Sequence, residues 1–179
     1  MGALKEEDLP YYSYDDYKLW KGDWELIHGV PYAMAPAPMI KHQKISNKIA
    51  WHLQEVLKEC TTCQALLPVD WKIDKHTIVE PDNLVICHEP QHDAYITQAP
   101  KVIFEILSKS TAHKDKNLKY SLYEKEGVNY YIIVDPTESI AKIYRLHKGR
   151  YIKVCDTHND SVNFTLESCN FSFDFAKIW

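Results

Sequence analysis

Glycine is scarce in this sequence, with 5 residues in 179. Phosphate-binding loops of the P-loop type and the G-x-G-x-x-G turn of dinucleotide-binding folds need closely spaced glycines, and neither pattern is present. The nucleophile elbow G-x-S-x-G of α/β-hydrolases is absent as well. A Ser-His-Asp triad assembled from distant residues is not excluded, although nothing in the sequence indicates one.

Long apolar runs and a strong excess of charge are also lacking. No run approaches the roughly 18 residues of a membrane-spanning helix, and residues 1–8 are polar and acidic, unlike a signal peptide. We therefore expect a cytoplasmic protein without membrane contact. The net charge of −4 gives the whole chain no general attraction for nucleic acid. Two segments are nonetheless basic: residues 39–58 hold four Lys and one acid, and residues 101–125 hold six Lys and three acids.

The five cysteines are an odd number, which is typical of a reducing compartment rather than of a disulfide framework. Cys60 and Cys63 form a C-x-x-C pair. A zinc site would need a second such pair or two suitably spaced His, and neither is evident. Redox chemistry of the thioredoxin type lacks support because no predicted strand leads into the pair. We interpret both residues as ordinary thiols near a helix end.

The chain, 45% apolar and 26% charged, is long enough for one globular domain and hardly for two. Apolar spacing predicts helices from about His42 to Glu59 and over Ala112–Glu126. Alternating or short apolar segments predict strands at Trp24–Ile27, Val69–Ile73, Lys101–Ser108, Asn129–Val134, Ile140–Leu146, Tyr151–Cys155 and Phe171–Phe175. Thr77–Cys87 is a further strand candidate, interrupted by Pro81. This order predicts an α/β (α+β) fold with a mixed sheet, in which the second helix forms a β-α-β crossover.

Two acidic residues stand in apolar surroundings. Glu105 lies in V-I-F-E-I-L and shares one strand face with Ile103 and Leu107. A carboxylate buried there must be paired, hydrogen-bonded or metal-bound. Asp82, in E-P-D-N-L-V-I, is by itself better explained as a solvent-facing acid at a strand end. Two carboxylates on neighbouring strands are nevertheless what Mg²⁺ needs, and bound Mg²⁺ lowers the pKa of water and neutralises phosphate charge.

The order and spacing of several segments resemble the PD-(D/E)XK nuclease superfamily, most closely its Uma-type branch of putative restriction endonucleases. The segments are E-L-I-x-G at 25–29, His42, P-D at 81–82, F-E-I-L-S-K-S-T at 104–111, D-x-x-x-K at 115–119, Tyr123, G-V at 127–128 and Y-Y-I-I-V-D-P at 130–136. The resemblance implies a single nuclease-like domain over 1–179. Its restriction-endonuclease-like core, at about 24–146, would be a mixed central β-sheet flanked by helices, with a C-terminal hairpin extension at 147–179.

The resemblance also implies that Asp82 and Glu105 bind Mg²⁺ or Mn²⁺ and that a metal-activated water hydrolyses a DNA phosphodiester bond. The usual third group is a Lys two residues after the Glu, and this position is Leu107. In the Uma-type branch that Lys comes from the following helix, which identifies Lys119 as the matching residue. Glu25 matches an accessory acid that supports the metal or its waters, and an edge-strand acid is an equal alternative.

Alternatives stay open for the cation and for the DNA contacts. Lys119 also fits a surface i,i+4 ion pair, and Lys72 is a competing donor from an adjacent strand. His42 would contact a phosphate or assist proton transfer, although a structural hydrogen bond explains it as well. Lys109 and Lys116 would contact the DNA backbone in a salt-sensitive manner. The acidic net charge indicates weak binding, or binding that needs metal first.

Two rival hypotheses come from other functional classes. The absence of Lys at position 107 and the acidic net charge support a catalytically silent nuclease-fold module for DNA binding or assembly. The second rival is a homodimer in which the hairpin Ile140–Cys155 pairs at a sheet edge across a two-fold axis.

Overall fold

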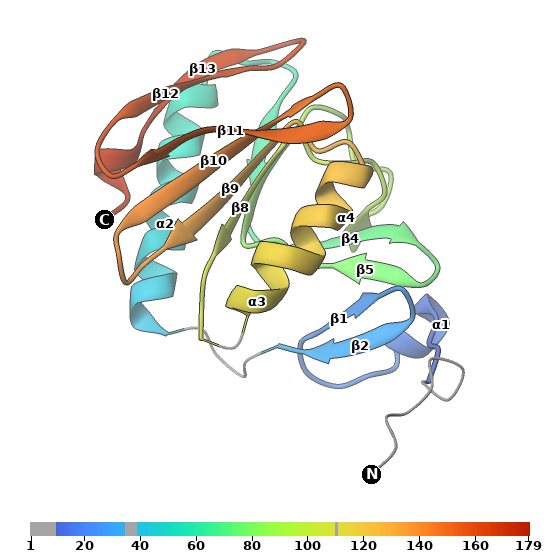
Figure 1. The fold of residues 1–179 in the computed structure, drawn as a ribbon. Helices are drawn as coiled ribbons and strands as arrows, with labels where there is room; N and C mark the ends of the chain where they lie inside the picture. The colour runs from blue at the N-terminus through green and yellow to red at the C-terminus, as the bar shows by residue number, and fades with distance from the viewer. Residues whose placement is uncertain (1–9, 35–38, 110) are drawn as a thin grey trace.

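The computed structural model describes residues 10–34, 39–109 and 111–179. The expectation about a signal peptide concerns residues 1–8, which lie outside these ranges. Within them the strands form a six-stranded sheet, a five-stranded sheet and a two-stranded hairpin, with helices on both sides of the larger sheet (Figure 1). The α+β class and the mixed, helix-flanked sheet are as expected, but the strands divide between two sheets rather than one.

The six-stranded sheet carries the predicted β-α-β crossover. In spatial order it consists of β11 (Arg150–Thr157), β10 (Ile140–His147), β9 (Tyr130–Asp135), β8 (Val102–Ile106), β6 (Asn83–Ile86) and β3 (Gln64–Leu66). β8 and β9 are parallel, and their other sheet neighbours pair with them antiparallel. Every residue of β8 is buried, so this strand is central and covered on both faces.

The five-stranded sheet includes the strand of Glu25. It consists of β2 (Val30–Ala33), β1 (Trp24–Ile27), β5 (Thr77–Val79), β4 (Asp70–Asp74) and β7 (Tyr95–Ile96). The strand candidate Thr77–Cys87 breaks at Pro81 as expected, and its two halves belong to different sheets: β5 to this one and β6 (Asn83–Ile86) to the other. Pro81 offers no N–H to a ladder and keeps the preceding residue extended. The chain therefore leaves one sheet and enters the other at Glu80-Pro81-Asp82.

Two helical segments cover opposite faces of the six-stranded sheet (Figure 1). α2 (Ile40–Leu57) packs its apolar stripe against the β8 face that carries Phe104. The segment α3 (Ala112–Lys114) to α4 (Tyr120–Lys125) covers the face that carries Ile103. The remaining elements are the short α1 (Tyr14–Tyr17), the hairpin of β12 (Ser161–Thr165) and β13 (Asn170–Asp174), and a 3-10 helix at Phe175–Lys177. The alternate aromatics Phe171, Phe173 and Phe175 are buried as predicted, although Phe175 lies just after the strand.

The predicted helix Ala112–Glu126 is not uniform. Residues Asp115–Lys119 form a π-helical turn between α3 and α4, a local widening that often marks functional sites. Asp115 and Lys119 are each only 2% exposed. The interpretation of this pair as a surface ion pair is therefore wrong.

The interpretation of Cys60 and Cys63 as ordinary thiols is also wrong. Disulfides join Cys60 to Cys169 and Cys63 to Cys87, across sequence separations of 109 and 24 residues. Among the described residues, Cys155 is the free cysteine. The described helices include none with the length and hydropathy that crossing a bilayer requires.

Candidate active site

A cleft of about 630 Å³ opens near the start of α2, where the chain passes from one sheet to the other. Five of the seven residues singled out in the sequence line it: His42, Asp82, Glu105, Lys109 and Lys119. Glu25 is fully buried beneath the cleft and contacts Lys119. Lys116 is exposed and is not among the described residues that line the cleft. The fold thus brings six of the seven residues to one place.

Lys119 is the central cation of this site. Its Nζ lies 2.7 Å from Oε1 of Glu25 and 2.8 Å from Oε1 of Glu105, and 3.8 Å from Oδ1 of Asp115. Glu25 belongs to one sheet and Glu105 to the other, so the lysine joins the two sheets through buried charge. Burial lowers the pKa of Lys119, but Glu105 and Glu25 outweigh it and hold this pKa well above its usual range. Lys119 is therefore a protonated donor rather than a base.

Glu25 is saturated with donors. Its Oε1 accepts the N–H of Glu80 at 2.9 Å in addition to the Lys119 contact, and its Oε2 accepts a hydrogen bond from Lys114. Burial raises the pKa of this carboxyl, but Lys119 and Lys114 together hold it below its usual range. Glu25 is thus an ionised anchor that fixes two lysines at the floor of the cleft.

Glu105 has the opposite electrostatic environment. Burial raises the pKa of this carboxyl well above its usual range, and the charges of Asp115 and Asp82 add to the increase while Lys119 opposes it. The hydroxyl of Tyr123 donates to Oε1 of Glu105 at 2.7 Å. Ile103 and Leu107 pack on the same side of β8 as Glu105, as the alternation predicts.

Asp82 stands directly before β6 and beside Glu105. Asn83 pairs with Phe104 across β6 and β8, so one step back in the register places Asp82 opposite Glu105. Its Oδ2 accepts the N–H of Ile106 at 2.7 Å, and its Oδ1 lies 3.2 Å from Nε2 of His42. Burial lowers the pKa of His42, but the hydrogen bond and charge of Asp82 raise it more.

The charges at this site fit a divalent cation. Four carboxylates stand against two lysines in this group: Glu25, Asp82, Glu105 and Asp115 against Lys114 and Lys119. In addition, Oδ1 of Asp115 is buried and has no hydrogen-bond partner among the described residues. More carboxyl groups than lysines, with one carboxylate oxygen unsatisfied, are an environment that suits the oxygen-preferring ions Mg²⁺ and Mn²⁺.

The sequence assigned no role to two groups at or beside the cleft. Tyr123 matched the family pattern, but nothing in the sequence showed that its hydroxyl would reach Glu105. Glu80 lines the cleft, and burial together with the charge of Asp70 raises its pKa to about 7. Lys72, the competing donor, instead lies 3.9 Å from the ring centre of Tyr14.

Comparisons with known proteins show the family and the fold of the chain. The family model Uma2, described as a putative restriction endonuclease, matches residues 14–172. Among solved structures, the fold is similar to that of a putative nuclease belonging to DUF820 from Anabaena variabilis ATCC 29413, with a TM-score of 0.75. The two sequences are 18% identical, and the match covers 93% of this chain and 96% of that chain. No curated protein matches the chain.

Proposed function

We propose that this chain, which belongs to the Uma2 family of putative restriction endonucleases, hydrolyses DNA phosphodiester bonds as a metal-dependent endonuclease. One observation carries the proposal. Asp82, Glu105 and Lys119 come from three separate segments and meet at one cleft. A chain that used these residues only for stability would not need an excess of carboxylates at an open cleft.

The carboxylates and the lysine have different tasks. Asp82 and Glu105 would hold Mg²⁺ or Mn²⁺, which when bound lowers the pKa of a coordinated water and neutralises charge on a phosphate oxygen. Lys119, which stays protonated, donates hydrogen bonds to the attacking water and to the charge that develops on the phosphate. Glu25 is a positioning residue, because its contacts with Lys119 and Lys114 fix where these donors lie.

The remaining residues serve DNA binding. His42 orients Asp82 through the 3.2 Å contact and contacts a phosphate when protonated. Lys109 at the cleft and Lys116 on the outer surface of the helical segment contact the DNA backbone. Such contacts are independent of sequence and weaken as salt increases.

β11 is an outer strand of its sheet, and its exposed Ile152 and Val154 are the surface on which a homodimer would form.

The test is cleavage of supercoiled and linear DNA in Mg²⁺, in Mn²⁺ and in EDTA. The wild-type chain is compared with Asp82→Asn and Glu105→Gln, which remove a negative charge at nearly constant shape. Asp93→Asn, an exposed acid outside the cleft lining, is the matched control. We expect metal-dependent cleavage in the wild type and the control, and a loss of at least about 100-fold in both cleft variants.

The silent DNA-binding module is the competing function. It is favoured by Leu107, which lies at the cleft where the superfamily pattern has Lys, and by the direct ion pair between Lys119 and Glu105. A folded wild-type chain that binds DNA without cleaving it in either metal would establish this alternative. Cleavage that persists in Asp82→Asn would refute the assigned metal ligand.

A further inference from the structure

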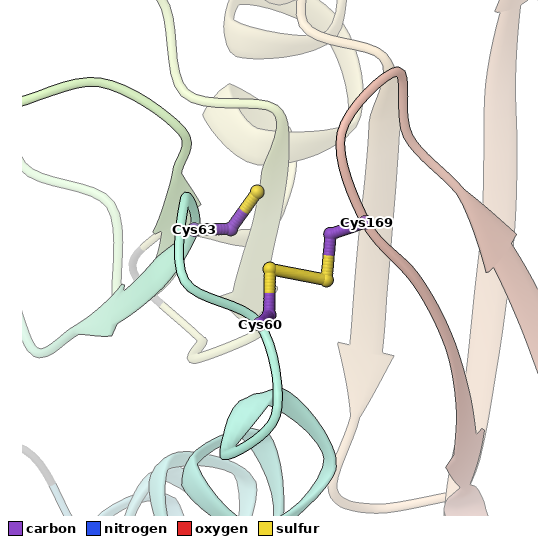
Figure 2. A group of neighbouring side chains, drawn as sticks. All are labelled: Cys60, Cys63 and Cys169. Atoms are coloured by element: carbon purple, nitrogen blue, oxygen red, sulfur yellow. A yellow bond between two sulfur atoms is a disulfide. The ribbon is translucent and has the colours of Figure 1, made fainter.

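Four cysteines from distant parts of the chain lie close together at the C-terminal end of β6. Asp82 stands at the other end of this strand. Cys60 follows α2, Cys63 precedes β3, Cys87 follows β6, and Cys169 lies in the turn between β12 and β13. The sulfurs of Cys60, Cys63 and Cys169 all lie within 4.8 Å of one another (Figure 2). Cys87 is bonded to Cys63, so its sulfur adjoins this group of three.

We propose that the reduced chain binds one Zn²⁺ through the thiolates of Cys60, Cys63, Cys87 and Cys169. The C-x₂-C spacing of the first two is that of structural zinc sites, and the fold supplies the second pair that the linear sequence does not show. Tetrahedral zinc with bonds of about 2.3 Å spaces its sulfurs about 3.8 Å apart. Three of the four sulfurs already lie within 4.8 Å of one another and the fourth is bonded to one of them, so side-chain rotations can bring all four around one ion once the disulfides are reduced.

The surroundings of the cluster suit thiolates. The hydroxyl oxygen of Thr62 lies 3.7 Å from the sulfur of Cys60 and 3.8 Å from that of Cys63. The hydroxyl oxygen of Ser168 lies 3.5 Å from the sulfur of Cys63. Hydroxyls in these positions donate to sulfur once it is ionised and orient the ligands around the metal.

The burial of the cluster also agrees with a structural site. The cavity beside Cys87 is lined by Lys101, Glu126 and Glu167, so the charges around the cluster are mixed and the support for the site comes from the sulfurs. Cys63 is buried, and the other three sulfur ligands pack against the main apolar core. Four thiolates fill a tetrahedral shell and leave no coordination position open for a substrate, so the ion would have a structural role.

Binding is an acid–base reaction of the thiol form. Four S–H groups release four protons to solvent and form four Zn–S bonds, and no electrons are exchanged. Starting from the disulfide-bonded chain, a dithiol reductant must first supply two electrons and two protons to each S–S bond, and it is itself oxidised to a disulfide. The zinc form and the disulfide form are therefore alternative states of the same four residues.

The cluster ties together the elements that carry the cleft. It joins the C-terminal ends of α2 and β6 to the hairpin of β12 and β13. The opposite ends of α2 and β6 carry His42 and Asp82, which contact each other at the cleft. Loss of the metal from the reduced chain should therefore loosen this frame. The expected signature is a lower midpoint of unfolding when the reduced protein is treated with a chelator.

The test uses the full chain reduced with a dithiol and kept without oxygen. Zinc content is measured per chain, and Co²⁺ is then substituted because thiolate-to-cobalt charge-transfer absorption reports sulfur ligands specifically. We expect one Zn²⁺ per chain, intense charge-transfer absorption, and loss of both in Cys60→Ser and Cys169→Ser. Cys155→Ser is the matched cysteine control and should keep both. Asp82→Asn should keep the cobalt absorption, which separates this site from the cleft.

Alkylation of the wild-type chain provides a readout that does not depend on the folding of any variant. In the zinc-loaded protein, an alkylating reagent should modify Cys155 faster than the other four cysteines, and chelation should remove the difference. The proposal is overturned if the reduced wild-type chain retains no zinc and develops no thiolate-to-cobalt absorption. The four residues would then serve only as two disulfides.

Discussion

Replacing Lys119 by Met tests whether the buried cation holds the two sheets together at the cleft. Met keeps much of the length and volume of the side chain but removes the charge. In the structure the ammonium group pairs with Glu25 and Glu105 at 2.7 and 2.8 Å. The two carboxylates are 0% and 3% exposed, so water cannot replace the lost partner.

The size of the effect follows from what remains after the substitution. Removing one partner of a buried ion pair costs about 3–5 kcal/mol because a buried charge loses its compensation. Glu25 keeps Lys114, and Glu105 keeps the hydroxyl of Tyr123. We therefore expect the lower end, a loss of about 3 kcal/mol in the free energy of unfolding at pH 8 in EDTA. With a urea slope of about 2 kcal/mol/M, the midpoint falls by about 1.5 M.

Two further measurements separate charge from packing. Glu105 and Asp115 have raised pKa values because they are buried. They take up protons as the pH falls, so the cost of Lys119→Met should be smaller at pH 5 than at pH 8. The double variant with Glu105→Gln should recover part of the loss, since coupled residues differ from additivity by about 0.5–3 kcal/mol.

The matched control is Lys116→Met, an exposed lysine in the same π-helical turn. It should change stability by no more than about 0.5 kcal/mol. A loss below about 1 kcal/mol for Lys119→Met would refute the reasoning. So would a loss that is the same at pH 5 and pH 8, because packing rather than charge would then explain it.

Three more substitutions have expected outcomes in urea unfolding. The pKa of Glu80 is raised to about 7, so its charge opposes folding increasingly from about pH 4.5 to 7. After a discount for the partial exposure of the side chain, Glu80→Gln should raise the free energy of unfolding by about 1 kcal/mol at pH 8 and hardly at all at pH 4.5. Equal gains at the two pH values would contradict this. Tyr123→Phe removes a buried donor to Glu105 and should cost about 1.5–3 kcal/mol; a cost below about 0.5 kcal/mol would show that the hydrogen bond contributes little. Burial lowers the pKa of His42, but the contact with Asp82 contributes to a net increase. The pair therefore stabilises the fold fully below pH 6.5 and less as the pH rises through the folded pKa. His42→Gln should lower the free energy of unfolding more at pH 6 than at pH 9, and an equal loss would be evidence against a charged pair.

The local part of the site could be predicted from the sequence. Glu105 stands in a short apolar strand with strict alternation, so its face and its burial follow from the pattern alone. The resemblance to the nuclease family added Asp82 and Lys119, and the structure places both at the same cleft. The burial of Glu105 and the location of the other two residues could be anticipated because each depends on a short segment or on an ordered set of segments.

Features that depend on pairing between distant segments could not be predicted in this way. Pro81 indicated an interruption, but the change of sheet depends on the partners that β5 and β6 find elsewhere in the chain. The burial of Asp115 and Lys119 depends on Glu25, which arrives from the other sheet. Cys60 finds Cys169 across 109 residues. In each case the deciding contact lies outside any window that a periodicity covers.

Because of the π-helical turn at Asp115–Lys119, a change of one residue in chain length could alter the site and leave the fold in place. A π-turn closes its hydrogen bond over five residues instead of four, so it accommodates one extra residue while the helical segments on either side keep their faces. Deleting a residue between Asp115 and Lys119 would restore the ordinary spacing, with Leu122 still packed on the sheet. The same deletion would shift Lys119 relative to Asp115. The contact of the Lys119 ammonium group with Glu105 therefore depends on the number of residues in this turn.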